Sequence, residues 1–206
     1  MSGLLATVVA YLFGSIPFGY LAGRVKGVDI RTVGSRNIGT TNVFRTLGKG
    51  WGAAVLVADM GKGLAAVVVA DAAAGGAWPV LAAGAAVIGH LAPVWLRFRG
   101  GKGVAVAGGA LIGLMPLASA FLVGAWVVIV AVTRYVSVAS IVVALAFTPL
   151  AWALGYHVEY VVFAGVVSAL VLFRHRANMR RLAAGKELRL DLRRGRGRRA
   201  GGGAEV

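Results

Sequence analysis

The sequence predicts an all-α integral membrane protein, a bundle of seven transmembrane helices, from three observations. Hydrophobic residues make up 59% of the 206 residues and the mean hydropathy is +0.81, whereas soluble domains are about 45–50% apolar. The apolar residues gather into stretches of membrane-spanning length. The Lys and Arg residues gather in the segments at one end of those stretches. Abundant Gly and Ala within the stretches favour close helix packing, so we expect a compact bundle.

Six apolar stretches are candidate spans, and one is too long for a single crossing. They are residues 3–23, 51–72, 78–96, 104–132, 135–154 and 158–173. The fourth contains Met115-Pro116 near its middle, where proline favours a break. Splitting it gives seven crossings, with two halves of about 14 residues, or ~21 Å each. Helices this short would be tilted, would thin the bilayer or would be re-entrant. The competing interpretation is five spans with a long fourth segment.

The charge distribution orients the predicted bundle. Residues 24–50, residues 97–103 and the segment after Phe173 are rich in Lys and Arg, whereas 73–77 and 155–159 contain neither. The positive-inside rule places the first group in the cytoplasm, so the N-terminus lies outside and the C-terminus is cytoplasmic. An even number of crossings must then separate 97–103 from the tail, which favours the split at Pro116. The uncharged start of the chain is predicted as a first span and not as a cleaved signal peptide.

Composition also excludes several classes of site and partner. The chain has no cysteine, which excludes disulfides, thiolate metal ligands and a Cys nucleophile. Its three histidines lack close carboxylate partners, so we expect no metal and no cofactor. The net charge is +15; in so apolar a chain this points to anionic membrane lipid and not to nucleic acid. No obligate protein partner is evident. We expect a membrane domain at residues 1–187 and a basic, disordered tail at 188–206.

Three polar runs interrupt the apolar chain, and each contains groups that bind phosphate. The first, residues 34–45, combines a Gly-rich backbone that exposes N–H groups with hydroxyl, amide and guanidinium side chains. An ordinary basic loop would explain its arginines but not its hydroxyl and amide content. Its candidate substrate-binding residues are Ser35, Asn37, Thr41, Asn42 and Arg45.

The second run places Lys102 among glycines just before a predicted helix. A helix N-terminus adds N–H donors, so the backbone of Gly100, Gly101 and Gly103 is expected to bind an anion together with Lys102. The run is no Walker A motif, because position 96 is Leu and Gly103 follows the lysine. A flexible basic turn is the alternative interpretation.

The third run follows the last span and contains His175 and Asn178, which share a helical face. Histidine can exchange a proton near neutral pH, which makes His175 a candidate base; a basic cap at the membrane surface is the alternative. Asp59 and Lys62 also share a helical face and can pair within the second span. For His90, in the third span, a structural role is favoured over catalysis.

The polar motifs together resemble one known family. They read Gly34-Ser35-x-Asn37-x-Gly39-x-Thr41-Asn42-x-x-Arg45; Gly89-His90-x-x-Pro93 before Phe98-x-Gly100-Gly101-Lys102-Gly103; Thr133-Arg134-Tyr135-Val136-Ser137-x-x-Ser140; and Arg174-His175-x-x-Asn178-x-x-Arg181-Leu182-x-x-Gly185-x-Glu187. In this order and spacing they resemble the bacterial acyl-phosphate:glycerol-3-phosphate acyltransferase family, over roughly residues 11–187.

The resemblance implies a seven-helix enzyme of the bacterial cytoplasmic (inner) membrane, with its motifs facing the cytoplasm. It implies transfer of a fatty acyl group from acyl phosphate to the sn-1 hydroxyl of glycerol 3-phosphate. The products are lysophosphatidic acid and inorganic phosphate, in the first step of phospholipid synthesis. A small transporter for an organic anion and a lipid-binding scaffold are the rival classes; all the motifs lie on one predicted side, which disfavours the transporter.

On this interpretation the candidate catalytic residues are Ser35 and His175. His175 is the candidate base for the glycerol hydroxyl, and the phosphate oxygens of the acyl phosphate are the alternative proton acceptor. Ser35 orients a head group; a covalent acyl–Ser35 intermediate is less favoured, because the mixed anhydride is already activated. The substrate-binding candidates are Asn37, Thr41, Asn42, Arg45, Gly100, Gly101, Lys102, Gly103, Ser140 and Asn178.

Overall fold

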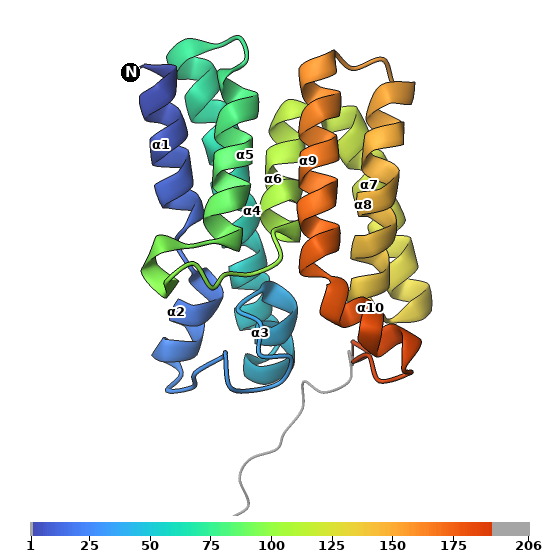
Figure 1. Cartoon of the computed structure of the whole chain (residues 1–206). Coiled ribbons are helices and arrows are strands. Elements are labelled where there is room, and N and C mark those ends of the chain that lie inside the picture. The colour runs from blue at the N-terminus through green and yellow to red at the C-terminus, as the bar shows by residue number, and fades with distance from the viewer. Residues whose placement is uncertain (1, 191–206) are drawn as a thin grey trace, which may run out of the picture.

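The computed structural model describes residues 2–190, and every regular element in that range is a helix (Figure 1). The helices are α1 (Gly3–Gly14), α2 (Phe18–Val25), α3 (Thr40–Leu47), α4 (Lys49–Ala74), α5 (Trp78–Leu91), α6 (Val104–Leu114), α7 (Pro116–Thr133), α8 (Val136–Ala153), α9 (Val158–Arg174) and α10 (Arg176–Ala183). A 3-10 turn, η1 (Val94–Leu96), follows α5. The all-α prediction is therefore confirmed for this part of the chain.

Five helical units are long and apolar enough to cross a membrane, and α9 with α10 makes a sixth if this pair, bent by 53°, is counted as one span. The five are Gly3–Val25, Lys49–Ala74, Trp78–Leu96, Pro116–Thr133 and Val136–Ala153. Helix α6 is apolar but has only 11 residues, about 17 Å at ~1.5 Å per residue. Within the described residues, a seventh crossing therefore depends on this short helix.

The long apolar stretch at 104–132 divides at Met115, as predicted. Met115 leaves the helical region with φ −142° and ψ 63°, and Pro116 begins α7, a position where its missing N–H costs nothing. The expectation of two equal halves is wrong, because α6 has 11 residues and α7 has 18. Pro116 fixes the boundary between α6 and α7. The apolar sequence after this proline is longer than the apolar sequence before it, so the two helices differ in length.

The first apolar stretch forms two helices instead of one. Helix α1 ends at Gly14 and α2 begins at Phe18, after Ile16-Pro17. Proline removes a backbone donor and clashes with a continuing helix. The break exposes carbonyl groups inside the bundle, and the Nζ of Lys62 lies 2.9 Å from one of them, the oxygen of Ile16. A charged side chain from α4 thus compensates a broken span.

Small residues bring the helices into close contact, as predicted. A Cβ added to Gly14 of α1 would lie 2.4 Å from the oxygen of Ala86 in α5. One added to Gly63 of α4 would lie 2.1 Å from the oxygen of Val106 in α6. Neither distance leaves room for a methyl group, so glycine at these positions lets the helix backbones touch.

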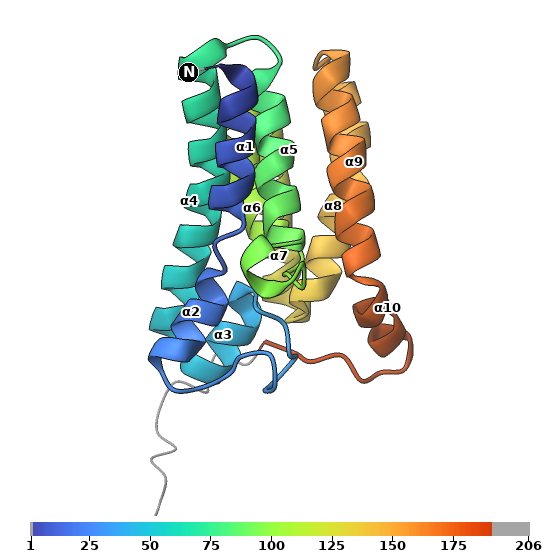
Figure 2. The same cartoon turned by 60° about the vertical axis from the view of Figure 1, so that its left-hand side comes forward.

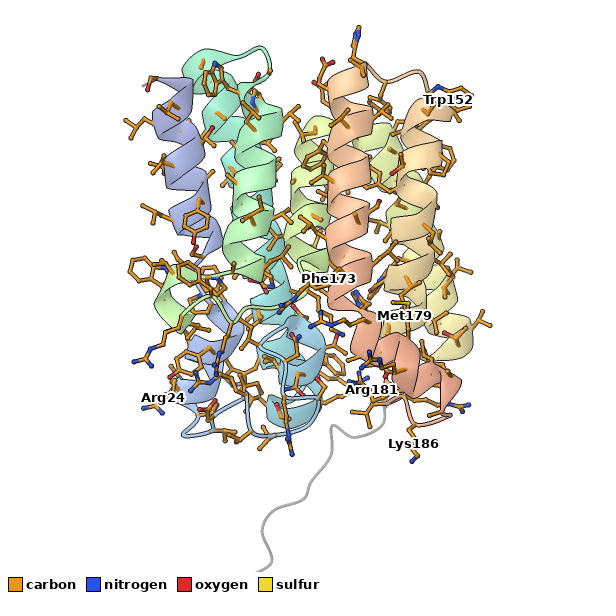
Figure 3. The ribbon with its side chains drawn as sticks, viewed as in Figure 1. Arg24, Trp152, Phe173, Met179, Arg181 and Lys186 are labelled. Carbon is orange, nitrogen blue, oxygen red and sulfur yellow. The ribbon has the colours of Figure 1, made fainter. Side chains whose placement is uncertain are left out.

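The two ends of the bundle differ in polarity. Helices α2, α3 and α10 lie at one end, and the N-terminal end of α1 lies at the other (Figures 1 and 2). Figure 3 shows Arg24, Arg181 and Lys186 at the first end and Trp152 at the second. We call the first the polar end; all three polar runs of the sequence approach it, which agrees with their expected placement on one side.

Candidate active site

A cavity of about 380 Å³ connects the three polar runs with the apolar interior of the bundle. Most of its polar lining comes from α3, the start of α10 and the loops of the polar end. The polar residues include Ser35, Asn37, Thr40, Thr41, Asn42, Arg45, Lys102, His175, Asn178 and Glu187. Its apolar lining comes from α6 to α9 and includes Leu111, Leu122, Trp126, Phe147 and Val167. The site is therefore amphipathic, with charged groups at one end and hydrocarbon walls beyond them.

The first polar run does not form a single loop, because its second half is helix α3. The side chain of Asn42 is buried and holds the turn that precedes this helix. Its Oδ1 accepts a hydrogen bond from the N–H of Ser35 at 2.8 Å. Its Nδ2 lies 2.9–3.1 Å from the carbonyl oxygens of Ile30, Val33 and Asn37. These contacts occupy its amide group, so Asn42 shapes the turn; that it also binds substrate stays a prediction.

Asn37 has a similar part in shaping this turn, since its Oδ1 accepts the N–H of Gly39 at 2.8 Å. Two residues in the turn adopt positive φ, Gly34 and Arg36, both at +59°. These conformations and the asparagine bonds direct the start of α3 toward the cavity. The side chains of Ser35, Thr40 and Thr41 line it.

Two buried polar atoms of α3 have no hydrogen-bond partner within the described residues: Thr40 Oγ1 and Arg45 Nε. The guanidinium of Arg45 is held by one bond, from Nη2 to the oxygen of Leu188 at 2.7 Å. Burial lowers the pKa of Arg45, an effect that Glu187 opposes. Unpaired buried donors are costly, and Thr40 is also the first residue of α3, where backbone N–H groups are free. This arrangement is suited to an anion.

The second polar run uses its glycines for packing. The N–H of Gly100 donates to the oxygen of Leu91 at 3.2 Å, and that of Gly101 donates to the oxygen of His90 at 3.0 Å. Both amides are therefore bonded within the protein, and their binding of phosphate stays a prediction. A Cβ on Gly101 would lie 2.2 Å from Nε2 of His90, so the loop needs glycine to lie against α5. Gly103, at φ +82°, precedes α6 and does line the cavity.

Lys102 is the charged group that this loop presents to the cavity. Its Nζ donates to Oδ1 of Asn178 at 2.5 Å. Burial lowers the pKa of Lys102 to about 8, with Glu187 opposing the shift and Arg181, Arg45 and Arg174 adding to it. The N-terminus of α6 begins two residues later. An ammonium group and unpaired helix N–H groups thus meet at one place.

The third polar run joins Lys102 through its amide and imidazole side chains. Asn178 accepts from Lys102 and donates from Nδ2 to Glu187 Oε1 at 2.6 Å. His175 is buried, and its Nδ1 lies 2.8 Å from the oxygen of Val171. Because a carbonyl only accepts, Nδ1 carries the proton and Nε2 is left as an acceptor. This tautomer is the one that a base requires.

Glu187 and Arg174 are residues whose roles the sequence reasoning missed. Glu187 accepts hydrogen bonds from Ser137 at 2.8 Å, Asn178 at 2.6 Å and Arg181 at 2.7 Å. Burial alone would raise the pKa of Glu187, but these bonds lower it. Arg174 donates to the oxygens of Gly100 and Gly101 at 2.5 and 2.9 Å. Only their places in the motif that runs from Arg174 to Glu187 distinguished these residues from other charged residues.

Two further expectations change with the structure. The hydroxyl of Ser140 donates to the oxygen of Val136 and accepts from Nε1 of Trp126, so it orients a cavity wall instead of presenting a free donor. The ordered chain also extends past the expected domain boundary at 187. Leu188 accepts from Arg45, and the N–H of Leu190 donates to the oxygen of Arg134 at 2.7 Å. The rest of the expected disordered tail, 191–206, lies outside the described residues.

The buried charges of the second and third spans form a cluster beside this site. Lys62 Nζ lies 2.9 Å from Asp59 Oδ1, which confirms the expected pairing. His90 Nδ1 lies 3.0 Å from the same Nζ. Asp59 and His90 also line the cavity. His90 thus makes the structural contacts that were expected of it.

Comparison with known proteins identifies the family. The family model described as "Glycerol-3-phosphate acyltransferase" matches residues 4–185. A glycerol-3-phosphate acyltransferase of Desulforudis audaxviator is 47% identical over 192 residues, covering 92% of this chain and 96% of the relative. One of Rubrobacter xylanophilus is 45% identical over 205 residues, covering 98% of this chain and all (100%) of the relative.

Two crystal structures share the fold. Both are of PlsY (YgiH), an integral membrane glycerol 3-phosphate acyltransferase, and both are 39% identical to this chain. The glycerol 3-phosphate form has a TM-score of 0.89 and covers 93% of this chain and 96% of its own. The lysophosphatidic acid form has a TM-score of 0.85 and covers 92% and 95%. The chain belongs to the glycerol-3-phosphate acyltransferase family.

Proposed function

We propose that this chain transfers a fatty acyl group from acyl phosphate to the sn-1 hydroxyl of glycerol 3-phosphate. The products are lysophosphatidic acid and inorganic phosphate, in the first step of phospholipid synthesis. The observation that carries the proposal is the single cavity in which cationic and hydroxyl groups meet apolar walls. The two PlsY structures, in glycerol 3-phosphate and lysophosphatidic acid forms, support an acceptor and a product of this kind.

The choice of acyl phosphate as donor is supported by the chemistry of the chain. An acyl phosphate is a mixed anhydride and is already activated, so no cysteine nucleophile is needed, and the sequence has none. The pattern His-x-x-x-x-Asp, common in acyltransferases that use acyl-CoA, is absent: five residues past His90, His157 and His175 stand Trp95, Val162 and Arg180. Two phosphate-bearing substrates also account for two separate cationic groups, Arg45 and Lys102.

In the proposed reaction, the sn-1 hydroxyl oxygen attacks the carbonyl carbon of the acyl phosphate. The bond between that carbon and the bridging oxygen breaks, and phosphate leaves with the bonding electrons. The hydroxyl proton passes to Nε2 of His175, which the bond from Nδ1 to Val171 leaves unprotonated. A phosphate oxygen of the donor is the alternative acceptor.

The remaining residues of the site hold the two substrates. Arg45 and Lys102 bind phosphate charge, assisted by the N-termini of α3 and α6. The hydroxyls of Ser35 and Thr41 orient the head groups from the first polar run. Asn178 fixes the ammonium of Lys102, to which it is hydrogen-bonded. The acyl tail lies along the apolar wall that includes Leu122 and Phe147.

The proposal extends to topology and location. We place the polar end in the cytoplasm of a bacterium and the start of α1 outside the inner membrane, because the basic loops gather at that end. Helix α6 serves as the short seventh crossing, packed in close contact with α4 at Gly63. Residues 188–206 carry basic side chains suited to anionic lipid. Residues 1–187 hold every residue to which the reaction assigns a chemical role.

The decisive experiment uses purified full-length protein in detergent, with acyl phosphate and glycerol 3-phosphate. We expect release of inorganic phosphate and equimolar lysophosphatidic acid, and both must depend on glycerol 3-phosphate. Acyl-CoA in place of acyl phosphate is the control for donor choice and is expected to give no product. A transporter or a scaffold would release no phosphate, so absence of acceptor-dependent turnover contradicts the proposal.

A further inference from the structure

The cluster of Asp59, Lys62 and His90 lies inside the bundle at the edge of the cavity. Their side chains are 2%, 0% and 6% exposed. The proposed reaction assigns them no role. Charges buried within a membrane span are costly, and a buried ion pair often adds less stability than apolar side chains of similar volume. Their presence therefore calls for a reason other than packing.

The ammonium of Lys62 lies close to three electronegative atoms, each from a different residue. Its Nζ lies 2.9 Å from Asp59 Oδ1, 3.0 Å from His90 Nδ1 and 2.9 Å from the oxygen of Ile16. The contact with Asp59 is an ion pair without linear hydrogen-bond geometry, since Oδ1 has no hydrogen-bond partner within residues 2–190. Lys62 thus connects α4, α5 and the break between α1 and α2.

This arrangement fixes the tautomer of His90. An ammonium group only donates, so Nδ1 of His90 must accept, and the imidazole proton lies on Nε2. That nitrogen faces the loop before α6, because a Cβ on Gly101 would lie 2.2 Å from it. The backbone oxygen of His90 accepts the N–H of Gly101 at 3.0 Å. His90 therefore contacts Gly101 through both its ring and its main chain.

The opposite side of the same loop is held by Arg174, whose guanidinium donates to the oxygens of Gly100 and Gly101. Gly101 is thus enclosed between His90 and Arg174. The next residue along the chain is Lys102, and a shift of Gly101 moves its ammonium relative to the cavity. Displacement of a binding group by about 1 Å can cost 10²-fold in rate.

We propose that Asp59, Lys62 and His90 are positioning residues that set the place of Lys102 through the contact between His90 and Gly101. Lys62 orients the imidazole, Asp59 balances the charge of Lys62, and His90 supports the loop. The inference rests on the proposed function, because it assigns Lys102 to the binding of substrate phosphate. It adds three residues from two spans, α4 and α5, to which the proposed reaction gives no role.

The test compares Lys62→Met with the double variant Asp59→Asn/Lys62→Met. The double variant removes both charges of the ion pair, so no unpaired charge is left inside the bundle. If the cluster serves only to pack the bundle, this variant should fold. Asp71→Asn, an exposed carboxylate on the same helix, is the matched control. Two measurements are made: kcat and KM for glycerol 3-phosphate, and hydrogen exchange of the amides of Gly100 and Gly101 in the purified protein.

We expect both variants to exchange these amides faster and to lose about 10- to 100-fold in kcat/KM, as is common when a supporting residue is removed. Asp71→Asn should match wild type in both measurements. If the double variant keeps wild-type exchange and wild-type KM, the cluster is a packing device and the proposal is overturned. Kinetic loss without faster exchange at Gly100 and Gly101 also overturns it.

A further variant, His90→Phe, tests the proposal if the Lys62 variants do not fold. His90→Phe keeps the ring volume and removes both ring nitrogens, and it is expected to show the same faster exchange. Wild-type exchange in folded His90→Phe contradicts the proposal. Hydrogen exchange needs no turnover, so it tests the positioning even if the wild-type enzyme proves inactive with acyl phosphate. Inactivity of the wild type would instead count against the proposed function.

Discussion

The turn and helix at residues 34–47 and the loop at 97–103 both contain glycine and basic residues but use their polar groups differently. The first has mostly hydroxyl and amide polar side chains, whereas the second has only glycines, basic residues and Phe98. In the first, side chains line the cavity, and Thr40 Oγ1 and Arg45 Nε remain unpaired among the described residues. In the second, the amides of Gly100 and Gly101 bond to α5, and Lys102 alone brings charge to the cavity.

The difference shows that glycine in a phosphate-binding pattern has two distinct uses. One is to expose N–H groups to an anion; the other is to let a loop lie against a neighbouring helix, which is the use at Gly101. The first region therefore offers several side-chain donors, with Arg45 among them, whereas the second offers one charge, Lys102, whose position depends on packing. Variants can test each half of this comparison.

Lys102→Met should have the largest effect, because it removes the one charge that the loop contributes. We expect kcat/KM to fall by about 100- to 1000-fold, the usual cost of deleting a donor that stabilises developing charge. Phosphate release measures it. Arg99→Ala, an exposed basic residue of the same loop, is the control and should retain wild-type turnover. Equal losses in both variants would mean that general basicity, and not the position of Lys102, matters.

Gly101→Ala should have the next largest effect, although it removes no functional group. Its Cβ would lie 2.2 Å from Nε2 of His90, so the loop must shift. Misplacement of Lys102 is expected to lower kcat/KM by about 10- to 100-fold. Gly84→Ala, where an added Cβ has nothing within 4 Å, should be neutral. Normal activity in Gly101→Ala would remove the packing explanation for this glycine.

The pH dependence of substrate binding should come from the loop and not from α3. The pKa of Lys102 is lowered to about 8, so its ammonium form is lost as the pH rises through that value. Phosphate binding requires the charged form, hence KM should rise by about tenfold between pH 7.5 and 9. Lys102→Arg should remove this rise, because guanidinium stays charged. A rise that persists in Lys102→Arg would assign it to another group.

Removal of the residues after Leu192 should have the smallest effect, leaving turnover at the wild-type value. The residues after Leu192 belong to none of the polar motifs, and the proposed reaction assigns them no role. Truncation after Lys186 is the variant to compare with it. This truncation deletes Glu187, which accepts from Asn178, and Leu188, whose carbonyl oxygen accepts from Arg45. It should lose activity in the acyl phosphate assay. Similar activity of the two truncations would rule out a role for Glu187.

Several features of the fold followed from local sequence. The break at Pro116 follows from the missing N–H of proline, and close helix contact follows from small residues such as Gly14 and Gly63. The equal division of 104–132 was wrong, because Pro116 acts locally whatever the length of the apolar stretch. The first span was confirmed, since Gly3–Val25 is long and apolar enough to cross a membrane, although Pro17 divides it into α1 and α2. Helix α3 was not expected, since its short polar sequence has no apolar repeat long enough to indicate a helix.

The sequence alone determined that the chain is an apolar helical protein whose polar runs approach one end, because hydrophobicity, charge and motif spacing are local properties. The tertiary structure decided which groups meet the cavity. It occupies the amides of Gly100 and Gly101 and the side chain of Asn42 with internal bonds, and it leaves Arg45 and Lys102 at the cavity. Hydrogen-bond partners distant in sequence make these assignments, and no local pattern contains them.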